Sequence, residues 1–230
     1  MSNAQGHHAR GRMIASRIAL ASASASLFAM AVGALVLPRS VPGYSSIGQT
    51  VSDLAAVGAP TRSAMNVCGS VTAGCLIILA VFLIDIAWPA RTFLALAGLF
   101  ALSSLVVPKP APHVDTPGHT AAVTCLAVFL GFWPLAVFAH PRRRWAVSLR
   151  ATGWYTGFAL VLGLTFLFNW LQASPITGLL ERLFLFTELI ATLAFTALGT
   201  RAEQLGDAAD SAAPPRRPDL SADANRPKEF

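Results

Sequence analysis

Six apolar stretches hold more than half of this chain, and each is long enough, or nearly so, to cross a lipid bilayer. They cover residues 17–37, 65–88, 92–107, 120–138, 152–171 and 178–200. A helix rises about 1.5 Å per residue, so about 20 residues cross the roughly 30 Å of hydrocarbon in a membrane. The third and fourth stretches are the shortest. The sequence therefore predicts an all-α fold, a polytopic bundle of six transmembrane helices.

The composition agrees with a membrane protein and excludes an ordinary soluble domain. Hydrophobic residues make up 54% of the chain and charged residues 12%, whereas soluble domains are about 25% charged. The net charge is +6, but the basic residues lie in short loops and tails rather than on one folded face. We therefore expect the bilayer as partner and no nucleic acid. No phosphate-binding glycine loop or paired-cysteine motif occurs, and no cofactor is predicted.

The distribution of lysine and arginine predicts the topology. If the N-terminus is cytoplasmic, thirteen of the seventeen fall on the cytoplasmic side and four on the other side. The cytoplasmic group is Arg10, Arg12, Arg17, Arg91, Arg142, Arg143, Arg144, Arg150, Arg201, Arg216, Arg217, Arg226 and Lys228, and the outer group is Arg39, Arg62, Lys109 and Arg182. Cytoplasmic loops of membrane proteins carry such an excess. We expect a multi-pass plasma-membrane protein with both termini in the cytoplasm.

Three regions follow from this topology: a cytoplasmic tail over residues 1–16, the six-helix domain over 17–201 and a disordered cytoplasmic tail over 202–230. The N-terminal arginines and the Ala-Ser-Ala-Ser-Ala run at 21–25 partly resemble a secretory signal. The apolar stretch is longer than a usual signal core, however, and its removal would leave five spans. We therefore expect the first span to be retained.

The predicted outer connections are longer than the cytoplasmic ones. Residues 38–62 alternate polar and apolar side chains at helical spacing, which predicts a short extracellular amphipathic helix between the first and second spans. Residues 108–118 contain four prolines, which predict a stiff, extended crossing. On the cytoplasmic side, residues 89–91 predict a tight turn between the second and third spans.

Ionisable groups inside hydrocarbon are costly and are the default functional candidates. Glu188 lies about ten residues into the last span, at a depth of about 15 Å. It belongs to a polar stripe that we expect to face the bundle interior: Thr177, Glu181, Glu188, Thr192 and Thr196. Glu188 is either a neutral acid hydrogen-bonded across helices or a working proton or ligand group. Asp85, near the inner end of the second span, is expected to pair with Arg91.

The remaining polar candidates gather at the predicted outer end of the bundle. His119 opens the fourth span, in a first turn that Thr116 or Asp115 can cap. The candidate ligand-binding residues are Asp53, Asn66, His119, Asn169, Glu181, Arg182 and, below them, Glu188. Polar groups concentrated on one side of the membrane predict a pocket that is open to the exterior and binds a lipid or small solute.

Two other functions stay open. The spacing His113-x-Asp115-x3-His119 offers ligand types that zinc accepts, so a metal-dependent membrane lipid hydrolase is one alternative. These three residues are weak metal candidates, because no zinc-binding helical pair accompanies them, and the sequence predicts neither a metal nor catalysis. The other alternative is a structural or accessory membrane subunit. The sequence sets no oligomeric state.

Three segments resemble one bacterial family. They are Tyr44-Ser45-Ser46-Ile47 leading to Thr50-Val51-Ser52-Asp53-Leu54, then Thr116-Pro117-Gly118-His119, and Gly178-Leu179-Leu180-Glu181-Arg182-Leu183. Together they resemble the domain of unknown function 998 family, which groups bacterial six-span membrane proteins. The resemblance covers roughly residues 18–201 and implies the six-helix architecture without an activity. The stretch around Lys109 departs from the Phe-Pro-x-Asp form expected of that family.

Overall fold

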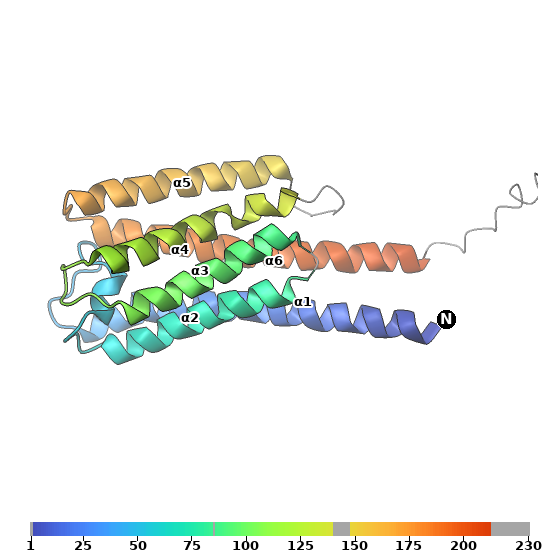
Figure 1. Cartoon of the computed structure of the whole chain (residues 1–230), viewed down its shortest axis with the longest axis horizontal. Helices are drawn as coiled ribbons and strands as arrows, with labels where there is room; N and C mark the ends of the chain where they lie inside the picture. Colours follow the sequence, from blue (N-terminus) through green and yellow to red (C-terminus); the bar gives the residue numbers. More distant parts are fainter. Residues whose placement is uncertain (1, 85, 140–147, 213–230) are drawn as a thin grey trace, which may run out of the picture.

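Six long helices run side by side in the computed structural model, which describes residues 2–84, 86–139 and 148–212 (Figure 1). They are α1 (Ser2–Ala31), α2 (Arg62–Phe82), α3 (Trp88–Val106), α4 (Pro117–Ala136), α5 (Leu149–Leu171) and α6 (Thr177–Ala212). Six helical segments are long and apolar enough to cross a membrane, the first of them running from Arg10 to Ser40. The predicted all-α polytopic bundle is therefore confirmed.

Both terminal helices continue into regions where the sequence analysis placed tails. α1 begins at Ser2, and α6 continues to Ala212. Residues 202–205, Ala-Glu-Gln-Leu, are good helix formers, so nothing local stops α6 at the end of the apolar stretch. The remainder of the predicted disordered tail, residues 213–230, lies outside the described residues.

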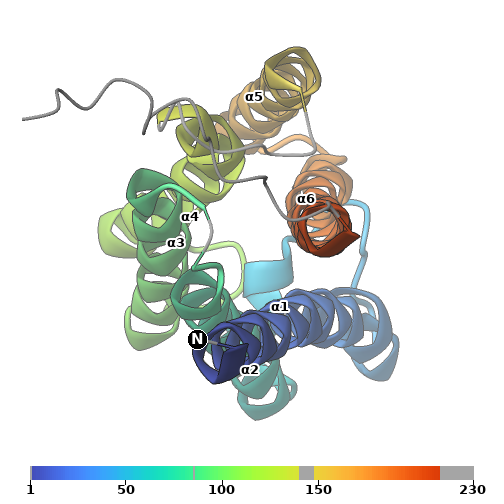
Figure 2. The ribbon, with the colours of Figure 1, turned by 90° about the vertical axis from the view of Figure 1, so that its right-hand side faces the viewer.

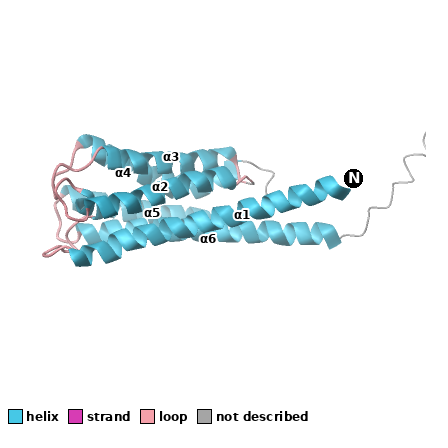
Figure 3. Cartoon of the chain, turned by 90° about the horizontal axis from the view of Figure 1, so that it is seen from below, coloured by secondary structure: helices cyan, strands magenta, loops and turns pink. Residues whose placement is uncertain are grey.

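The connections place the long loops together. The α1–α2, α3–α4 and α5–α6 connections lie at one end of the bundle, which we call the loop end (Figures 1 and 3). The start of α1 and the end of α6 lie at the opposite end, with the α2–α3 turn. An even number of helices returns the chain to the side where it began. The candidate residues Asp53, His119, Glu181 and Arg182 thus belong to the same end.

The α2–α3 turn differs from its predicted position. α2 ends at Phe82 and α3 begins at Trp88, so Pro89 lies in the first turn of α3, where its missing N–H leaves no helical hydrogen bond unmade. Arg91 donates from Nε to the Ala80 carbonyl, 2.7 Å away, and from Nη2 to the Val81 carbonyl, 3.1 Å away. A cation at these last carbonyls of α2 favours the helix end. Asp85, its predicted partner, lies outside the described residues, as do His140 and the arginine run 142–144.

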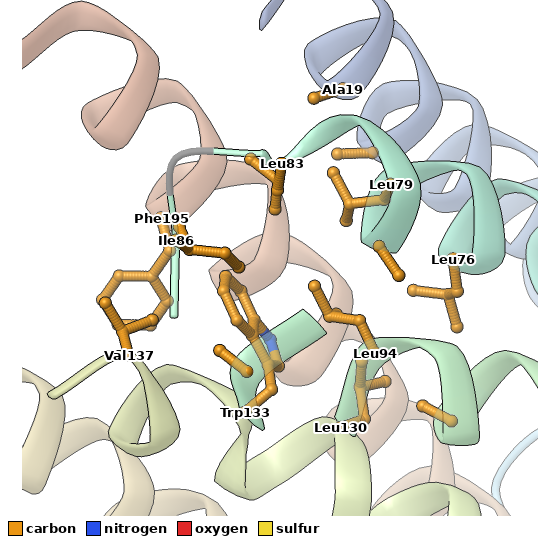
Figure 4. Packing of buried hydrophobic residues seen from close by; sticks show 14 of the residues in the cluster. Ala19, Leu76, Leu79, Leu83, Ile86, Leu94, Leu130, Trp133, Val137 and Phe195 are labelled. Atoms are coloured by element: carbon orange, nitrogen blue, oxygen red, sulfur yellow. The ribbon is translucent and has the colours of Figure 1, made fainter. Parts of the chain in front are cut away.

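The half of the bundle away from the loop end is closed by a packed apolar cluster (Figure 4). Trp133 of α4 is fully buried in it, and its indole N–H donates to Thr192 Oγ1 of α6 at 3.2 Å. Leu94 of α3 and Phe195 of α6 belong to the same cluster. Burying side chains of this size stabilises the bundle by roughly 1.5–3 kcal/mol each. The packed cluster leaves the loop end as the place for a cavity.

The α1–α2 connection folds inward over the loop end. It contains a π-helical turn (Val32–Val36), a 3₁₀ turn (Leu37–Ser40) and a second 3₁₀ turn (Val51–Ala55), here called η3. In the view along the bundle, η3 lies inside the ring of helices, between α2 and α6 (Figure 2). Leu54 is 1% exposed. In place of the predicted amphipathic helix there is thus a single 3₁₀ turn, which lies inside the loop end of the bundle.

Candidate ligand-binding site

An ion cluster of Asp53, Lys109 and Asp115, the first two of them buried, joins the α1–α2 and α3–α4 connections. Lys109 Nζ lies 2.7 Å from Asp53 Oδ1 and 3.1 Å from Asp115 Oδ1, and the Lys109 side chain is 2% exposed. Its third hydrogen-bond partner is Thr50 Oγ1, at 3.4 Å. The three protons of the ammonium are therefore matched by three oxygens. Trp170 of α5 ties the cluster to the helices, donating from Nε1 to Asp115 Oδ2 at 3.0 Å.

Asp53 also holds the backbone of both connections. It accepts the N–H of Thr50, which closes a capping box on η3, and the N–H of His113, each at 2.9 Å. Burial would raise the pKa of Asp53, but the hydrogen bonds from Lys109 and His113 outweigh it and hold that pKa below its usual value. Burial likewise opposes the charge of Lys109, yet Asp53 and Asp115 raise its pKa above the usual value. Both partners are charged at neutral pH.

Arg182 is buried against main-chain carbonyls. Its Nε donates to Ala34, 3.1 Å away, and its Nη1 lies 2.8 Å from the Ser46 carbonyl and 2.9 Å from that of Gln49. The Ala34 carbonyl is available because Pro38, four residues later, has no N–H to give it. Gly178 permits this approach, because a Cβ there would lie 2.0 Å from the Gln49 carbonyl oxygen. Arg182 therefore fastens the α1–α2 connection to α6.

Tyr44 completes the surroundings of Arg182. Its hydroxyl accepts from Arg182 Nη2 at 2.7 Å and donates to the Thr50 carbonyl at 2.6 Å. Burial raises the pKa of Tyr44 to about 12, although the adjacent guanidinium opposes the shift. The phenol is therefore neutral at physiological pH. With its donors engaged in this way, Arg182 stands apart from the cavities described below, none of which it lines.

His119 lies in the first turn of α4, where its backbone N–H is capped by Thr116 Oγ1 at 3.2 Å, as predicted. Its ring is buried, and Nδ1 lies 2.9 Å from the Val107 carbonyl and 3.1 Å from that of Ser104. Because both neighbours are acceptors, Nδ1 carries the proton. Nε2 is buried without a hydrogen-bond partner, and His119 is one of the residues that line the cavity beside it. In the neutral ring, Nε2 is an acceptor that lacks a donor.

Glu181 lies on α6 at the centre of the loop end. Its Oε2 accepts the N–H of Val51 in η3, and the residue is 7% exposed. Glu181 lines three neighbouring cavities. One turn further along its helix face, Leu185 lines two of the three. The carboxyl group of Glu181 is thus the polar group that the cavities share.

The cavities form a series from the loop end into the bundle. An outer one of about 400 Å³ is bounded by the ion cluster. A narrow one of about 50 Å³ at His119, Glu181 and Trp170 shares residues with it. Two inner ones follow, about 100 Å³ beneath η3 and about 260 Å³ between α4, α5 and α6. The walls of the inner pair are mostly apolar. A polar mouth above an apolar interior is typical of a site for an amphiphile.

Glu188 lies at the inner wall of the 260 Å³ cavity and is fully buried. Its Oε2 accepts the hydroxyl of Tyr155 on α5 at 2.6 Å. Its Oε1 has no hydrogen-bond partner. Gly131 of α4 leaves room for this oxygen, because a Cβ there would lie 3.2 Å from it. All five residues of the predicted polar stripe on α6 are buried.

The other predicted candidates lie in different settings. Asn66 lines the 100 Å³ cavity, while Asn169 donates to the Thr165 carbonyl of its own helix at 2.9 Å. The His113 side chain is 61% exposed and lies 3.0 Å from Gln49 Nε2. Among the residues that the structure describes, no three His, Cys, Asp or Glu side chains are grouped as a metal site. The predicted weak set around His113 therefore does not converge there.

Three residues of this site were missed from the sequence: Lys109, Tyr44 and Tyr155. Lys109 stands in the proline-rich α3–α4 connection, where its charge had only the value of a topology signal. The chain has two tyrosines against fourteen phenylalanines. Each tyrosine bonds a buried charged side chain of α6, Arg182 or Glu188. The rarity of tyrosine among the aromatic residues was therefore the sequence signal that could have pointed to these two hydroxyl groups.

These features define a multi-pass membrane protein whose polar residues converge at one end of a six-helix bundle. The model of the family described as "Protein of unknown function (DUF998)" matches residues 22–198. The chain belongs to this family, which confirms the resemblance found in the three segments of the loop end. No curated protein and no solved structure matches the chain.

Proposed function

We propose that this membrane protein binds an amphiphile, a lipid or a lipid-like solute, in the cavities at the loop end. The observation that carries the proposal is the buried, unpartnered Nε2 of His119, a residue that lines a mostly apolar cavity. An unpartnered acceptor in such surroundings costs about 1–3 kcal/mol, and a bound hydroxyl or amine would remove that cost. The protein would thus carry a built polar contact for one end of the ligand.

The arrangement of α5 supports an amphiphile rather than a fully polar solute. Only 17% of the apolar window of α5 is buried within the protein, against 44% for α6. The larger inner cavity lies along α5, next to the face that lipid would cover. A ligand with an apolar chain can therefore lie partly in the cavity and partly in the bilayer. We further propose, from the charge distribution, that the loop end faces the exterior of the plasma membrane.

The alternatives predict other features. A metal-dependent hydrolase needs a grouped set of ligands, and a purely structural subunit needs no ligand at all. Binding by the cavity is favoured because His119 and Glu188 each keep a buried acceptor atom free at a cavity wall. A side chain that served packing alone would gain stability from an internal partner for such an atom.

The test is the lipid content of the purified protein. Protein extracted in a mild detergent should retain about one amphiphile per chain, measured by native mass spectrometry and by analysis of the organic extract. Ala127 lines the larger inner cavity, so Ala127→Phe should fill part of that cavity and abolish this retention. The matched control is Val161→Phe, on the exposed face of α5, which should retain it. Equal retention by both variants, or none by the natural protein, would overturn the proposal.

A further inference from the structure

The larger inner cavity combines apolar walls with two acidic side chains. It is bounded by α4, α5 and α6, and its aromatic residues are Phe132, Phe166 and Phe184. Glu181 and Glu188 both line it, and none of the Lys, Arg or His residues that the structure describes does. The two carboxyl groups are seven residues apart on one helix face, about 10 Å by helical rise. The described lining of this cavity is therefore mostly apolar, with two acidic side chains.

Glu188 is placed as a group that awaits a donor. The Tyr155 hydroxyl donates to Oε2 of Glu188, and Oε1 has no hydrogen-bond partner. The residue is 0% exposed, so no solvent can supply the missing partner. Gly131 keeps the space beside Oε1 open. Among the described residues, the ion pairs involve Lys109 and His113 with Asp53 and Asp115, and none reaches Glu188. A buried carboxylate without a countercharge is strongly disfavoured.

The other free polar atom of the cavities has the same character. His119 Nε2 is an acceptor, because the ring proton is held by the carbonyls of Ser104 and Val107. Lys109, which lines the smaller inner cavity, has all three of its protons engaged. Among the described residues three buried side-chain atoms lack a partner: Ser26 Oγ on α1, His119 Nε2 and Glu188 Oε1. The last two belong to residues that line the cavities, and as acceptors both call for a donor. A ligand that carries a hydrogen-bond donor would satisfy whichever of the two atoms it reaches.

Resting on the proposed function, we infer that the ligand is a cationic amphiphile: a protonated amine on an unbranched apolar chain, whose ammonium group binds Glu188 Oε1. The ammonium supplies both the missing donor and the missing countercharge. Three phenylalanines line the same cavity, and the face of an aromatic ring attracts a cation. The apolar chain lies along α5 toward the bilayer.

The test compares three ligands of equal chain length on protein in phosphatidylcholine nanodiscs. Binding of tritiated dodecylamine, dodecanol and dodecanoate is measured by scintillation proximity, with empty nanodiscs to correct for partition into lipid. Dodecylamine should bind about tenfold to a hundredfold more tightly than dodecanol, because a charge-assisted hydrogen bond replaces a neutral one. Dodecanoate should bind most weakly. Lysophosphatidylethanolamine, an amine joined to a phosphate, distinguishes a lipid headgroup from a free amine as the natural source.

Glu188→Gln should remove the preference for dodecylamine and leave dodecanol binding nearly unchanged. Tyr155→Phe keeps the Glu188 carboxylate and should keep the preference for dodecylamine over dodecanol. If the Tyr155–Glu188 hydrogen bond served structure alone, Tyr155→Phe and Glu188→Gln would have the same effect. Should Glu188→Gln fail to fold, Gly131→Ala places a methyl group beside Oε1 and should weaken dodecylamine binding selectively.

Two results distinguish the failures. If dodecanol and dodecylamine bind equally and Ala127→Phe blocks both, the amphiphile site stands and the amine inference is overturned. If none of the ligands binds in excess of empty nanodiscs, both proposals are overturned. Retention of the amine preference in Glu188→Gln would also overturn the inference.

Discussion

Replacing Lys109 by methionine tests how the loop end is held together. Methionine keeps an unbranched side chain, one heavy atom shorter than that of lysine, and removes the positive charge between Asp53 and Asp115. Asp53, 3% exposed, would then be a buried carboxylate beside another carboxylate. Removing one partner of a buried ion pair costs about 3–5 kcal/mol. Asp53 keeps the backbone N–H groups of Thr50 and His113, so we expect the lower end of this range, about 3 kcal/mol.

The assay is thermal and denaturant unfolding in one detergent, with Arg39→Met as the matched control. Arg39 is an exposed cation in the same connection, and its replacement should change stability by about 0.5 kcal/mol or less. Adding Asp53→Asn to Lys109→Met should recover part of the loss, because the uncompensated charge is removed. A loss of less than about 1 kcal/mol in the free energy of unfolding of Lys109→Met would refute a stabilising role for the buried Lys109–Asp53 ion pair.

The pH dependence of the stability of Lys109→Met gives a second, independent test of the ion pair. In the natural protein, the contribution of Asp53 is present above its unfolded pKa near 3.9 and is lost as the pH falls through its lower folded pKa. The contribution of Lys109 is present below its unfolded pKa near 10.4 and is lost as the pH rises through its higher folded pKa. Without Lys109, burial dominates and raises the pKa of Asp53. Lys109→Met should therefore gain stability from pH 7 toward about pH 4, relative to the natural protein.

Three further changes probe the attachment of the α1–α2 connection to α6. Gly178→Ala puts a Cβ 2.0 Å from the Gln49 carbonyl oxygen, so we expect the free energy of unfolding to fall by about 1–3 kcal/mol. Residues 44–50 should also be cleaved faster by protease, and an unchanged protease pattern would contradict this contact. Arg182→Lys keeps the charge but loses the planar set of donors, and should lower the unfolding temperature even though Lys is charged; wild-type stability would show that charge alone suffices. Tyr44, with its pKa raised to about 12, should titrate above an ordinary tyrosine in ultraviolet difference spectra, and stability should fall between about pH 10 and pH 12. Ionisation at pH 10 in the folded protein would contradict the burial of the Tyr44 hydroxyl.

The helices and the buried face of α6 could be predicted because both follow from regular spacing. Apolar runs of about 20 residues set the spans, and the polar stripe from Thr177 to Thr196 repeats at helical intervals. The first turn of α4 could be predicted as well, since Thr116 precedes Pro117 in an N-cap pattern. These features depend on residues close together in sequence.

The partners of the charged residues could not be predicted, because they depend on irregular segments. Lys109 and Asp53 are 56 residues apart, and no periodicity relates them. Arg182 was expected to face a ligand, but its donors meet main-chain carbonyls whose directions are set by the loop conformation at residues 44–50. Asn169 was placed at the pocket from its depth alone, whereas its side chain turns back onto its own helix. Depth in the membrane does not determine which way a side chain points.

Photolabelling tests most directly whether an amphiphile occupies the loop-end cavities. Protein in nanodiscs is irradiated with a twelve-carbon amine that carries a diazirine midway along its chain, and the labelled peptides are mapped by mass spectrometry. We predict saturable labelling concentrated in residues 123–132 of α4 and 159–167 of α5, competed by unlabelled dodecylamine and abolished by Ala127→Phe. Labels spread evenly over the lipid-facing residues of all helices, without competition, would contradict the cavity as a binding site.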